Sequence, residues 1–493
     1  MGWLASMLLA SGVVQAAQPG GDVNAKAADG STPLLQAAYD GDAAKVAALL
    51  KGGADPRIAN AFGASPMGEA ARRGDAAVIG LLLKAGADPE SPNPEGQTAL
   101  MTVARTGNVE AAQLLLAHGA KINAREKWGG QTALIWAAAQ GQAQMVRFLL
   151  SKGADSSARG TVRDWQRKIT AEGRPKDMNR GGLTALLYAA REGNLDCVRE
   201  LAKGKADLNL ADPDGTTPLV LALMNGHWDT AKLLIESGAD INQWDFYGQS
   251  PLYVAVDIKT VESGGRVELP TYDKASAHDI VQLLLEKGAN PNLQLKLRPP
   301  FRNVPQDRLA DPMLTTGATA LLRAAKAGDV DSVKLLLDHG ARVSLRNVLG
   351  HSPLMAAAGS GRGNVPTRGR SKTEAQALET VRLLKEAGAD VNASAVDGDT
   401  AVHGAAIHGW NEVIKLLAGY GAELDVADKD GMTPIDYALA RYPLNYLESK
   451  PVPHESSAAM LKSLGATKET PNPPAWPALG VPQSSAQVPQ LPY

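Results

Sequence analysis

The chain has 493 residues, and its net charge of −2 arises from 50 Lys and Arg against 52 Asp and Glu. This balance gives no bulk reason to expect binding to nucleic acid or to an anionic membrane surface. The single cysteine, Cys197, excludes an intrachain disulfide and a cysteine cluster that binds metal. We expect Cys197 to be a small buried residue of a helix rather than a reactive thiol.

The first segment, residues 1–17, is an apolar run that ends in small residues. Val14 and Ala16 are placed for cleavage before Ala17, as in a secretory signal peptide. The run is short for a membrane-spanning helix, and it lacks the Lys or Arg that usually precedes the apolar part. We expect a secreted or periplasmic protein with no stable membrane insertion after cleavage. The alternatives are a cytoplasmic chain with an uncleaved leader and myristoylation at Gly2.

A repeated segment of about 33 residues follows, and its clearest copy begins at Asp214-Gly215. Gly215 lies in a tight turn, where glycine tolerates positive φ. Thr217 can cap a helix, and Pro218 suits its first turn. Gly226 ends this helix, and a second amphipathic helix ends at Gly238. Each copy therefore predicts a turn followed by two short helices.

The pattern recurs eleven times, and seven of the ten spacings between its turn glycines are 33 or 34 residues. The turn glycines are Gly30, Gly63, Gly96, Gly130, Gly182, Gly215, Gly248, Gly317, Gly350, Gly398 and Gly431. The repeat resembles the ankyrin repeat, and the resemblance covers residues 22–467. It implies an all-α fold, an ankyrin-repeat solenoid of about eleven helix-turn-helix repeats with projecting β-turn fingers, in which each repeat packs on its neighbours.

Four insertions and a tail depart from the period. The insertions are expected at 156–180, 258–275, 293–315 and 361–375. The first carries seven basic and three acidic side chains, and the last two also have a basic excess. Residues 468–493 are rich in proline and poor in charge, which predicts a disordered or polyproline-II tail.

Two positions differ from the family pattern. The histidine of the family's Thr-Pro-Leu-His motif remains only at His403, so we expect the local hydrogen bond of that histidine to be lost in the other copies. Lys205 stands where other copies have glycine. A left-handed conformation there would cost about 1 kcal/mol.

The sequence contains little that indicates catalysis. The motifs GxSxG, SxxK, HExxH, the Walker loop and CxxC are absent. His403 and His408 are five residues apart, a spacing that does not place both on one helical face. The turns at Asp212 and Asp428 resemble the start of a calcium loop but lack its bidentate acid. We predict no enzymatic activity, no catalytic residue, no cofactor and no metal site.

The stronger candidate is a binding surface. In ankyrin-like stacks the finger tips and the first helices line a concave side, and family members typically bind partners there. Aromatic and Arg side chains dominate interface energetics, and both types occur on the fingers, at the ends of first helices and in the first insertion. Such residues also serve packing between fingers and charge complementation at helix ends. The predicted binding residues are Trp128, Trp165, Arg163, Arg167, Arg105, Arg191, Trp244, Phe246 and Tyr247.

These features favour a non-enzymatic scaffold that binds a protein or peptide of acidic character, similar to secreted bacterial ankyrin-repeat proteins. One alternative is a module that binds an anionic small molecule or polysaccharide through the same Arg side chains. Another is an enzyme whose site is built on the insertions. Nucleic acid is not expected, because the basic excess is local to loops.

Overall fold

The computed structural model describes residues 22–164, 180–260, 272–299, 313–361, 372–441 and 452–470, with two further strands at 168–169 and 175–176. These residues form 22 helices and the two short strands. The eleven predicted helix pairs are therefore confirmed. The chain divides into two units. Unit 1 comprises Met1–Thr161, Leu183–Ala189 and Arg199–Ala206, and unit 2 comprises Val162–Gly182, Ala190–Val198 and Asp207–Tyr493.

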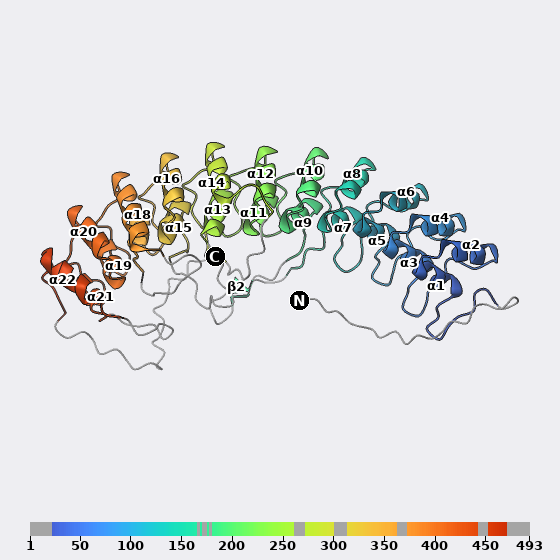
Figure 1. Cartoon of the computed structure of the whole chain (residues 1–493), viewed down its shortest axis with the longest axis horizontal. Coiled ribbons are helices and arrows are strands. Elements are labelled where there is room, and N and C mark those ends of the chain that lie inside the picture. Colours follow the sequence, from blue (N-terminus) through green and yellow to red (C-terminus); the bar gives the residue numbers. More distant parts are fainter. Residues whose placement is uncertain are drawn as a thin grey trace. The chain divides into compact units, whose positions relative to one another are not determined.

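Unit 1 contains four complete helix pairs, stacked one on the next. In Figure 1 its first helices (odd numbers) form one row and its second helices (even numbers) form another. The helices are α1 (Pro33–Asp40), α2 (Ala43–Lys51), α3 (Pro66–Arg73), α4 (Ala76–Lys84), α5 (Ala99–Thr106), α6 (Val109–Ala117), α7 (Ala133–Ala139) and α8 (Ala143–Ser151). A fifth pair, α9 (Ala185–Glu192) and α10 (Leu195–Lys203), is divided between the two units.

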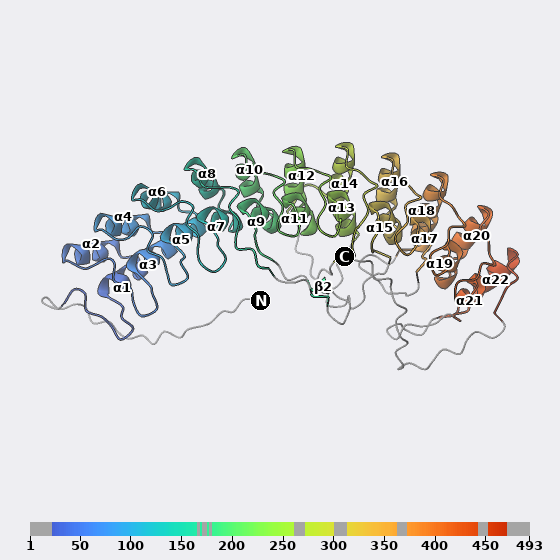
Figure 2. The same cartoon turned by 180° about the vertical axis from the view of Figure 1, so that it is seen from behind.

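Unit 2 contains six helix pairs with the same two-row arrangement (Figure 2). Its first helices are α11 (Pro218–Met224), α13 (Pro251–Lys259), α15 (Ala320–Ala327), α17 (Pro353–Ala357), α19 (Ala401–Ile407) and α21 (Pro434–Ala438). Its second helices are α12 (Trp228–Glu236), α14 (Ala277–Glu286), α16 (Val330–Asp338), α18 (Glu374–Glu386), α20 (Asn411–Gly419) and α22 (Glu455–Ser463).

The helix ends follow from the capping residues in the sequence. The Thr217 side chain accepts the Val220 N–H, and Pro218 occupies the first turn of α11. The second helices of several repeats begin at an Asp or Asn cap, as at Asp75. Gly74 ends α3 in the left-handed conformation with φ 68°. The apolar faces between the two rows form the core, and Cys197 is buried there as predicted.

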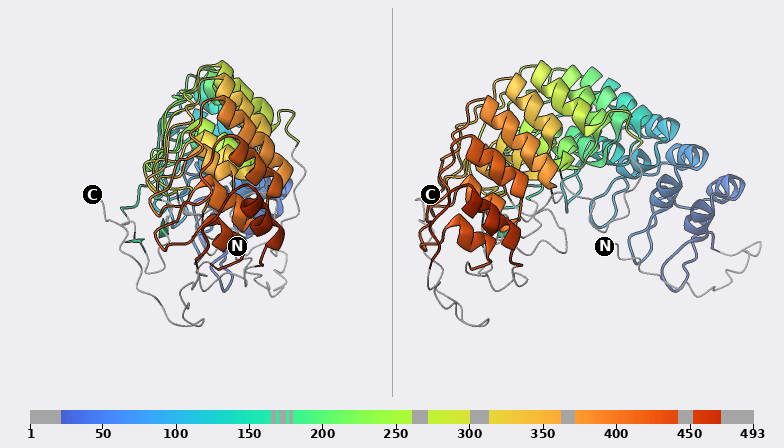
Figure 3. Two further views of the ribbon diagram at one scale, coloured as in Figure 1. Left: turned by 90° about the vertical axis from the view of Figure 1, so that its left-hand side faces the viewer. Right: turned by 60° about the vertical axis from the view of Figure 1, so that its left-hand side comes forward.

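The fingers are the turns that precede each first helix, and each is named here by its turn glycine. A polar side chain organises several of these turns, as where the Asn60 Oδ1 accepts the N–H groups of Phe62 and Ala64. A backbone hydrogen bond joins neighbouring fingers, such as Ala61 N–H to the Asp29 carbonyl at 2.9 Å. Figure 3 shows the finger loops of unit 2 gathered on one side of its helices.

The fourth position of the Thr-Pro-Leu-His motif forms the expected hydrogen bond at His403 and an unexpected one in the last repeat. The His403 Nδ1 lies 2.9 Å from the Thr400 Oγ1. In the last repeat the same position is Asp436, and its carboxylate accepts hydrogen bonds from the N–H and the Oγ1–H of Thr433. The local hydrogen bond expected to be lost is thus restored there by an acid.

The first insertion extends a finger. Val162 pairs with Gly181, and β1 (Lys168–Ile169) pairs antiparallel with β2 (Pro175–Lys176). Thr161 still donates its N–H to the preceding finger, at the Gly129 carbonyl. The extra residues therefore lie within the finger, between positions 161 and 182.

The tail also begins later than expected. Lys468 and Thr470 remain attached to the last repeat, because the Lys468 carbonyl accepts from the Thr433 hydroxyl and the Thr470 N–H donates to Asp436. The predicted boundary at 468 is therefore moved to 471. Residues 471–493 lie outside the described residues.

Candidate partner-binding surface

Trp128 projects from the Gly130 finger of unit 1 with 76% of its surface exposed. This finger is one residue longer than its neighbour, because the glycine spacing there is 34 rather than 33. The buried Glu126 carboxylate holds the longer turn. Its oxygens accept the N–H groups of Trp128 at 2.6 Å, Gly129 at 2.7 Å and Gln131 at 2.9 Å. The indole is thus exposed on a turn whose backbone is fixed.

Two neighbouring fingers continue this apolar edge. Phe62, on the Gly63 finger, is 74% exposed. Pro94, on the intervening Gly96 finger, is exposed and packs over Gly63, where an added Cβ would lie 2.6 Å from its Cγ. We call Phe62, Pro94 and Trp128 the unit 1 ridge. The sequence analysis missed Phe62, although it lies in the finger turn just before the turn glycine, a position that could have identified it.

The aromatic residues of the Gly248 finger in unit 2 differ in exposure. Trp244 is 41% exposed, and Lys296 Nζ lies 3.2 Å from the centroid of its ring. Phe246 is 48% exposed and packs edge-on against Tyr247, with ring centroids 5.3 Å apart. Tyr247 itself is only 6% exposed. Its ring packs inside the finger, so the prediction that it faces a partner is corrected.

The predicted Arg side chains do not join the finger aromatics in one patch. Arg105 and Arg191 lie near the C-terminal ends of α5 and α9, whereas the fingers precede the N-terminal ends of these helices. An eight-residue helix is about 12 Å long, so the two groups occupy opposite ends of the first helices. The Arg105 guanidinium lies 5.0 Å from the Trp136 ring centroid, and Arg191 pairs with Glu192 at 2.7 Å.

The structure describes only part of the predicted site in the first insertion. Arg163 lies in the extended finger and is half-buried, and its N–H donates to the Arg180 carbonyl at 2.7 Å. Trp165 and Arg167 lie outside the described residues.

Buried acids organise several fingers of unit 2. Asp245 is 2% exposed, and its carboxylate accepts the N–H groups of Tyr247 and Gln249 and the Gln249 amide. Burial raises the pKa of Asp245 to about 6, with an additional contribution from Asp212, and these hydrogen bonds oppose the shift. Perturbed acids often mark catalytic sites. Here the carboxylate oxygens are engaged by the turn itself, which makes Asp245 a structural residue.

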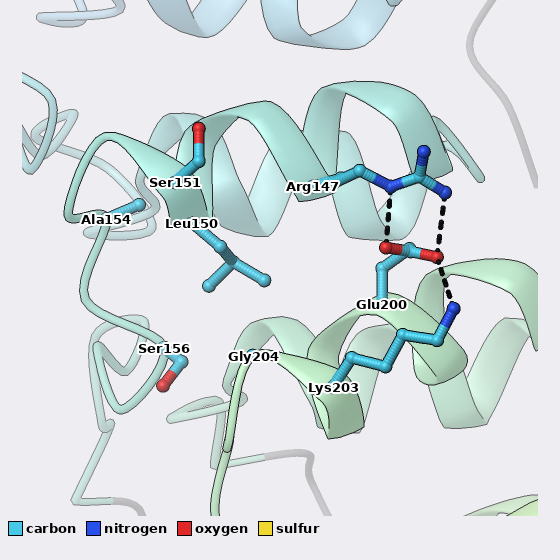
Figure 4. A pocket seen from close by; sticks show the side chains of 8 residues that line it. All are labelled: Arg147, Leu150, Ser151, Ala154, Ser156, Glu200, Lys203 and Gly204. Atoms are coloured by element: carbon cyan, nitrogen blue, oxygen red, sulfur yellow. Dashed lines mark hydrogen bonds and ion pairs between the residues drawn. The ribbon is translucent and has the colours of Figure 1, made fainter.

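A pocket of about 350 Å³ lies in unit 1 between α8 and α10, in the row of second helices (Figure 4). Arg147 from α8 and Lys203 from α10 converge on Glu200, with Arg147 nitrogens at 2.8 and 2.9 Å and Lys203 Nζ at 3.4 Å. The hydrogen bonds from Arg147 lower the pKa of Glu200 to about 2. A carboxylate held ionised in this way is a poor proton donor or acceptor near neutral pH.

The described residues hold no group of three or more His, Cys, Asp or Glu side chains arranged to bind a metal ion. Among the described helices, none combines the length and the apolar character that crossing a bilayer requires.

Comparison with known families gives matches along most of the chain. A family model described as "Ankyrin repeats (3 copies)" matches residues 4–93, 67–159, 167–245, 186–262, 274–366 and 372–448. A second model, described as "Ankyrin repeat", matches residues 247–296.

Individual relatives match shorter stretches. The human "Ankyrin repeat and KH domain-containing protein 1" is 38% identical over 122 residues, which is 24% of this chain and 4% of that protein. The mouse "Ankyrin repeat and SOCS box protein 16" is 36% identical over 121 residues, 24% of this chain and 25% of that protein. The chain thus spans a quarter or less of these curated relatives. A solved structure, the ankyrin repeat domain of Bcl-3, shows 27% identity and a TM-score of 0.38, covering 46% of this chain and 94% of its own.

Proposed function

Because this chain belongs to the ankyrin-repeat family, whose repeats generally serve protein binding rather than catalysis, we propose that it is a non-enzymatic scaffold for a protein partner. We place the contact on the finger edge of unit 1. The exposed Trp128 on a fixed turn is the observation that carries this proposal. A large aromatic ring held ready by Glu126 can be buried by a partner with little loss of conformational entropy.

The partner is expected to be acidic. Arg125 and Lys127 are exposed on either side of the buried Glu126, next to Trp128. The Arg125 guanidinium donates to the Arg159 carbonyl at 2.6 Å, which brings a third basic residue to the same finger edge. An apolar anchor beside basic side chains favours a protein surface with an apolar residue flanked by Asp or Glu.

Capture from a native extract tests this proposal. The full chain, the Trp128→Ala variant and the Tyr272→Ala control are immobilised, and retained proteins are quantified by mass spectrometry. Tyr272 is 95% exposed but precedes α14 and lies on no finger. We expect the amount of specifically retained protein to fall about tenfold or more for Trp128→Ala. The amount retained by Tyr272→Ala should be unchanged. Equal retention by both variants would reject the ridge as the contact.

Salt dependence addresses the alternative of an anionic small molecule or polysaccharide. A ligand held mainly by exposed Arg and Lys side chains is released by moderate salt, because exposed charges are screened. A protein anchored on Trp128 is less sensitive. Release of the bound material at about 0.5 M NaCl would therefore favour the alternative.

We also propose that the chain is exported, because of its apolar leader with small residues at positions 14 and 16. Reading the N-terminus of the mature protein from its source tests this. A sequence that begins near residue 17 is expected, and retention of Met1 on the mature chain would contradict export by cleavage.

A further inference from the structure

The pocket beside Glu200 coincides with a departure from the repeat pattern. Glu200 lies five residues before Lys205, the residue with positive φ that follows α10. At the same position the neighbouring helices α6, α8 and α12 carry a large apolar side chain, namely Leu114, Phe148 and Leu233. Leu114 points to the preceding helix, because its Cδ1 would lie 3.6 Å from a Cβ added at Gly80 of α4. In the fifth repeat a carboxylate occupies this position between second helices instead.

A second departure keeps the same place open. The residue before the one with positive φ is Gly204 here, whereas the neighbouring repeats have His118, Lys152 and Ser237. A Cβ added at Gly204 would lie 2.7 Å from the Cδ1 of Leu150, which lines the pocket. A side chain at position 204 would therefore displace Leu150. The fifth repeat has its glycine one residue early and accepts backbone strain at Lys205, and such local departures are most frequent at functional sites.

The charged side chains of the pocket have hydrogen-bond donors to spare. Arg147 and Lys203 are exposed, whereas Glu200 is buried. Among the described residues, Glu200 is the only acceptor that these two cationic side chains contact. They carry more N–H groups than the three that face Glu200, so donors remain for a second acceptor. Because the hydrogen bonds from Arg147 lower the pKa of Glu200 to about 2, two positive charges and one negative charge leave a net charge of +1 at neutral pH.

The walls and the size of the pocket define the ligand. The charged side chains lie at one end and Ser151, Ala154 and Ser156 at the other, with Leu150 between them (Figure 4). A net charge of +1 balances one carboxylate, whereas a phosphate dianion would add a charge that Glu200 repels. Leu150 and Ala154 offer contact to a short apolar body. The volume of about 350 Å³ is at the small end of the range of small-molecule sites.

We propose that this pocket binds a small monocarboxylic acid with a short apolar body. The carboxylate of the ligand accepts hydrogen bonds from Arg147 and Lys203, and its apolar body lies against Leu150. This site does not depend on the function proposed for the unit 1 ridge, because the ridge lies on the fingers and the pocket lies in the row of second helices.

Saturation-transfer NMR of the full chain tests the site, with N-acetyl-leucine as the probe and N-acetyl-leucinamide as its uncharged counterpart. We expect the acid to bind about tenfold more tightly than the amide, because only the acid has the charge that Arg147 and Lys203 attract. The peptide Ala-Ala-Ala-Leu presents the same carboxylate at the end of a chain. It should bind no more tightly than N-acetyl-leucine, because a pocket of this size has no room for the additional residues.

Substitutions at the pocket separate charge from shape. Lys203→Gln should weaken binding of N-acetyl-leucine about threefold to tenfold. Lys84→Gln, at the same position of α4, is the matched control and should bind normally. Glu200→Gln keeps the shape and removes the negative charge, so the acid should bind about threefold more tightly. Glu200→Leu restores the side chain of α6 and α12 and fills the pocket, so binding should fall about tenfold or more.

Thermal unfolding of each variant checks that it folds. Equal affinities for the acid and the amide, or unaltered binding by Lys203→Gln and Glu200→Leu, would overturn the proposal. Tighter binding of the peptide would also overturn it, because the pocket would then receive a chain terminus rather than a small molecule. The proposal equally fails if N-acetyl-leucine shows no saturable binding up to about 10 mM, since a ligand of this size should bind with a dissociation constant of about 1 mM.

Discussion

Lys205 adopts φ 61° at the position where Gly238 adopts φ 92° in the next repeat. Other repeats also place glycine there with positive φ, as at Gly86 and Gly119. A lysine pays a steric penalty in this conformation because its Cβ approaches the carbonyl oxygen, and glycine does not.

Lys205→Gly should therefore stabilise the chain. We expect an increase of about 0.5–1 kcal/mol in the free energy of unfolding, which is the relieved strain less the greater entropy of glycine in the unfolded chain. The urea midpoint measures it. The control is Lys232→Gly, an exposed position inside α12, where glycine should lower stability by about 1 kcal/mol. An unchanged or lower midpoint for Lys205→Gly would show that the left-handed turn is not strained.

Asp245→Asn should remove a loss of folding stability that grows as the pH rises. The pKa of Asp245 is raised to about 6 by burial, so the folded chain retains a proton that the unfolded chain releases near pH 4. Stability contributed by the protonated acid is present below pH 4 and is lost as the pH rises towards 6. We expect the Asn variant to be more stable than the unmodified chain at pH 7 by about 2 kcal/mol. The two should converge near pH 4.

Asn is a suitable replacement because Asn60 and Asn347 accept the same turn hydrogen bonds in their own fingers. Denaturant midpoints at several pH values between 4 and 7 give the measurement. A constant difference across this range would mean that Asp245 titrates normally.

His408→Asn should remove a loss of stability that develops as the pH falls, whereas Asp245→Asn removes one that develops as the pH rises. His408 stacks on Trp410 with ring centroids 4.5 Å apart. Burial, together with the positive charges of Lys372 and Lys326, lowers the pKa of His408 to about 4. The neutral ring stabilises the fold above pH 6.5, and this contribution is lost as the pH falls from 6.5 towards 4, because the unfolded chain takes up the proton first.

Asn is a matched replacement, because Asn225 ends α11 in the same way that His408 ends α19. The variant should therefore lose less stability than the unmodified chain between pH 6.5 and 4.5, as measured by thermal unfolding. Identical acid sensitivity in both proteins would exclude His408 as its source.

Glu126→Ala should weaken partner binding without touching the aromatic anchor. Removing the carboxylate leaves three turn N–H groups without their acceptor, so the Gly130 finger becomes less ordered. We expect partner capture to fall about threefold to tenfold, less than for Trp128→Ala. Glu110→Ala, at an exposed position in α6, serves as the control and should bind normally. Full binding by Glu126→Ala would argue against preordering of the finger.

The helical architecture could be predicted from the sequence because its signals are local. Capping residues such as Thr217, turn glycines such as Gly215 and the period of 33 residues each act within one repeat. The buried ion pair between Arg323 and Asp257, at 2.6 Å, could not be predicted. Its partners lie on either side of two insertions, which conceal the repeat spacing that would have aligned α13 with α15.

The site was predicted less completely, because exposure within a finger changes from one residue to the next. Phe246 is 48% exposed while the adjacent Tyr247 is 6% exposed, and composition alone does not distinguish them. Arg105 lies at the C-terminal end of α5, whereas the fingers precede the N-terminal ends of the first helices. The position of Arg105 within the repeat sequence did not reveal this separation. The extra residue that projects Trp128, however, was visible as a spacing of 34.

The most direct test of the proposed scaffold is a hydrogen-exchange footprint of the full chain with and without a partner captured from native extract. We predict slower exchange in the fingers of unit 1, at residues 60–64, 93–97 and 126–131, with the second helices unchanged. Slower exchange confined to α8 and α10 around the Glu200 pocket, with the fingers unchanged, would contradict the assignment of the binding surface.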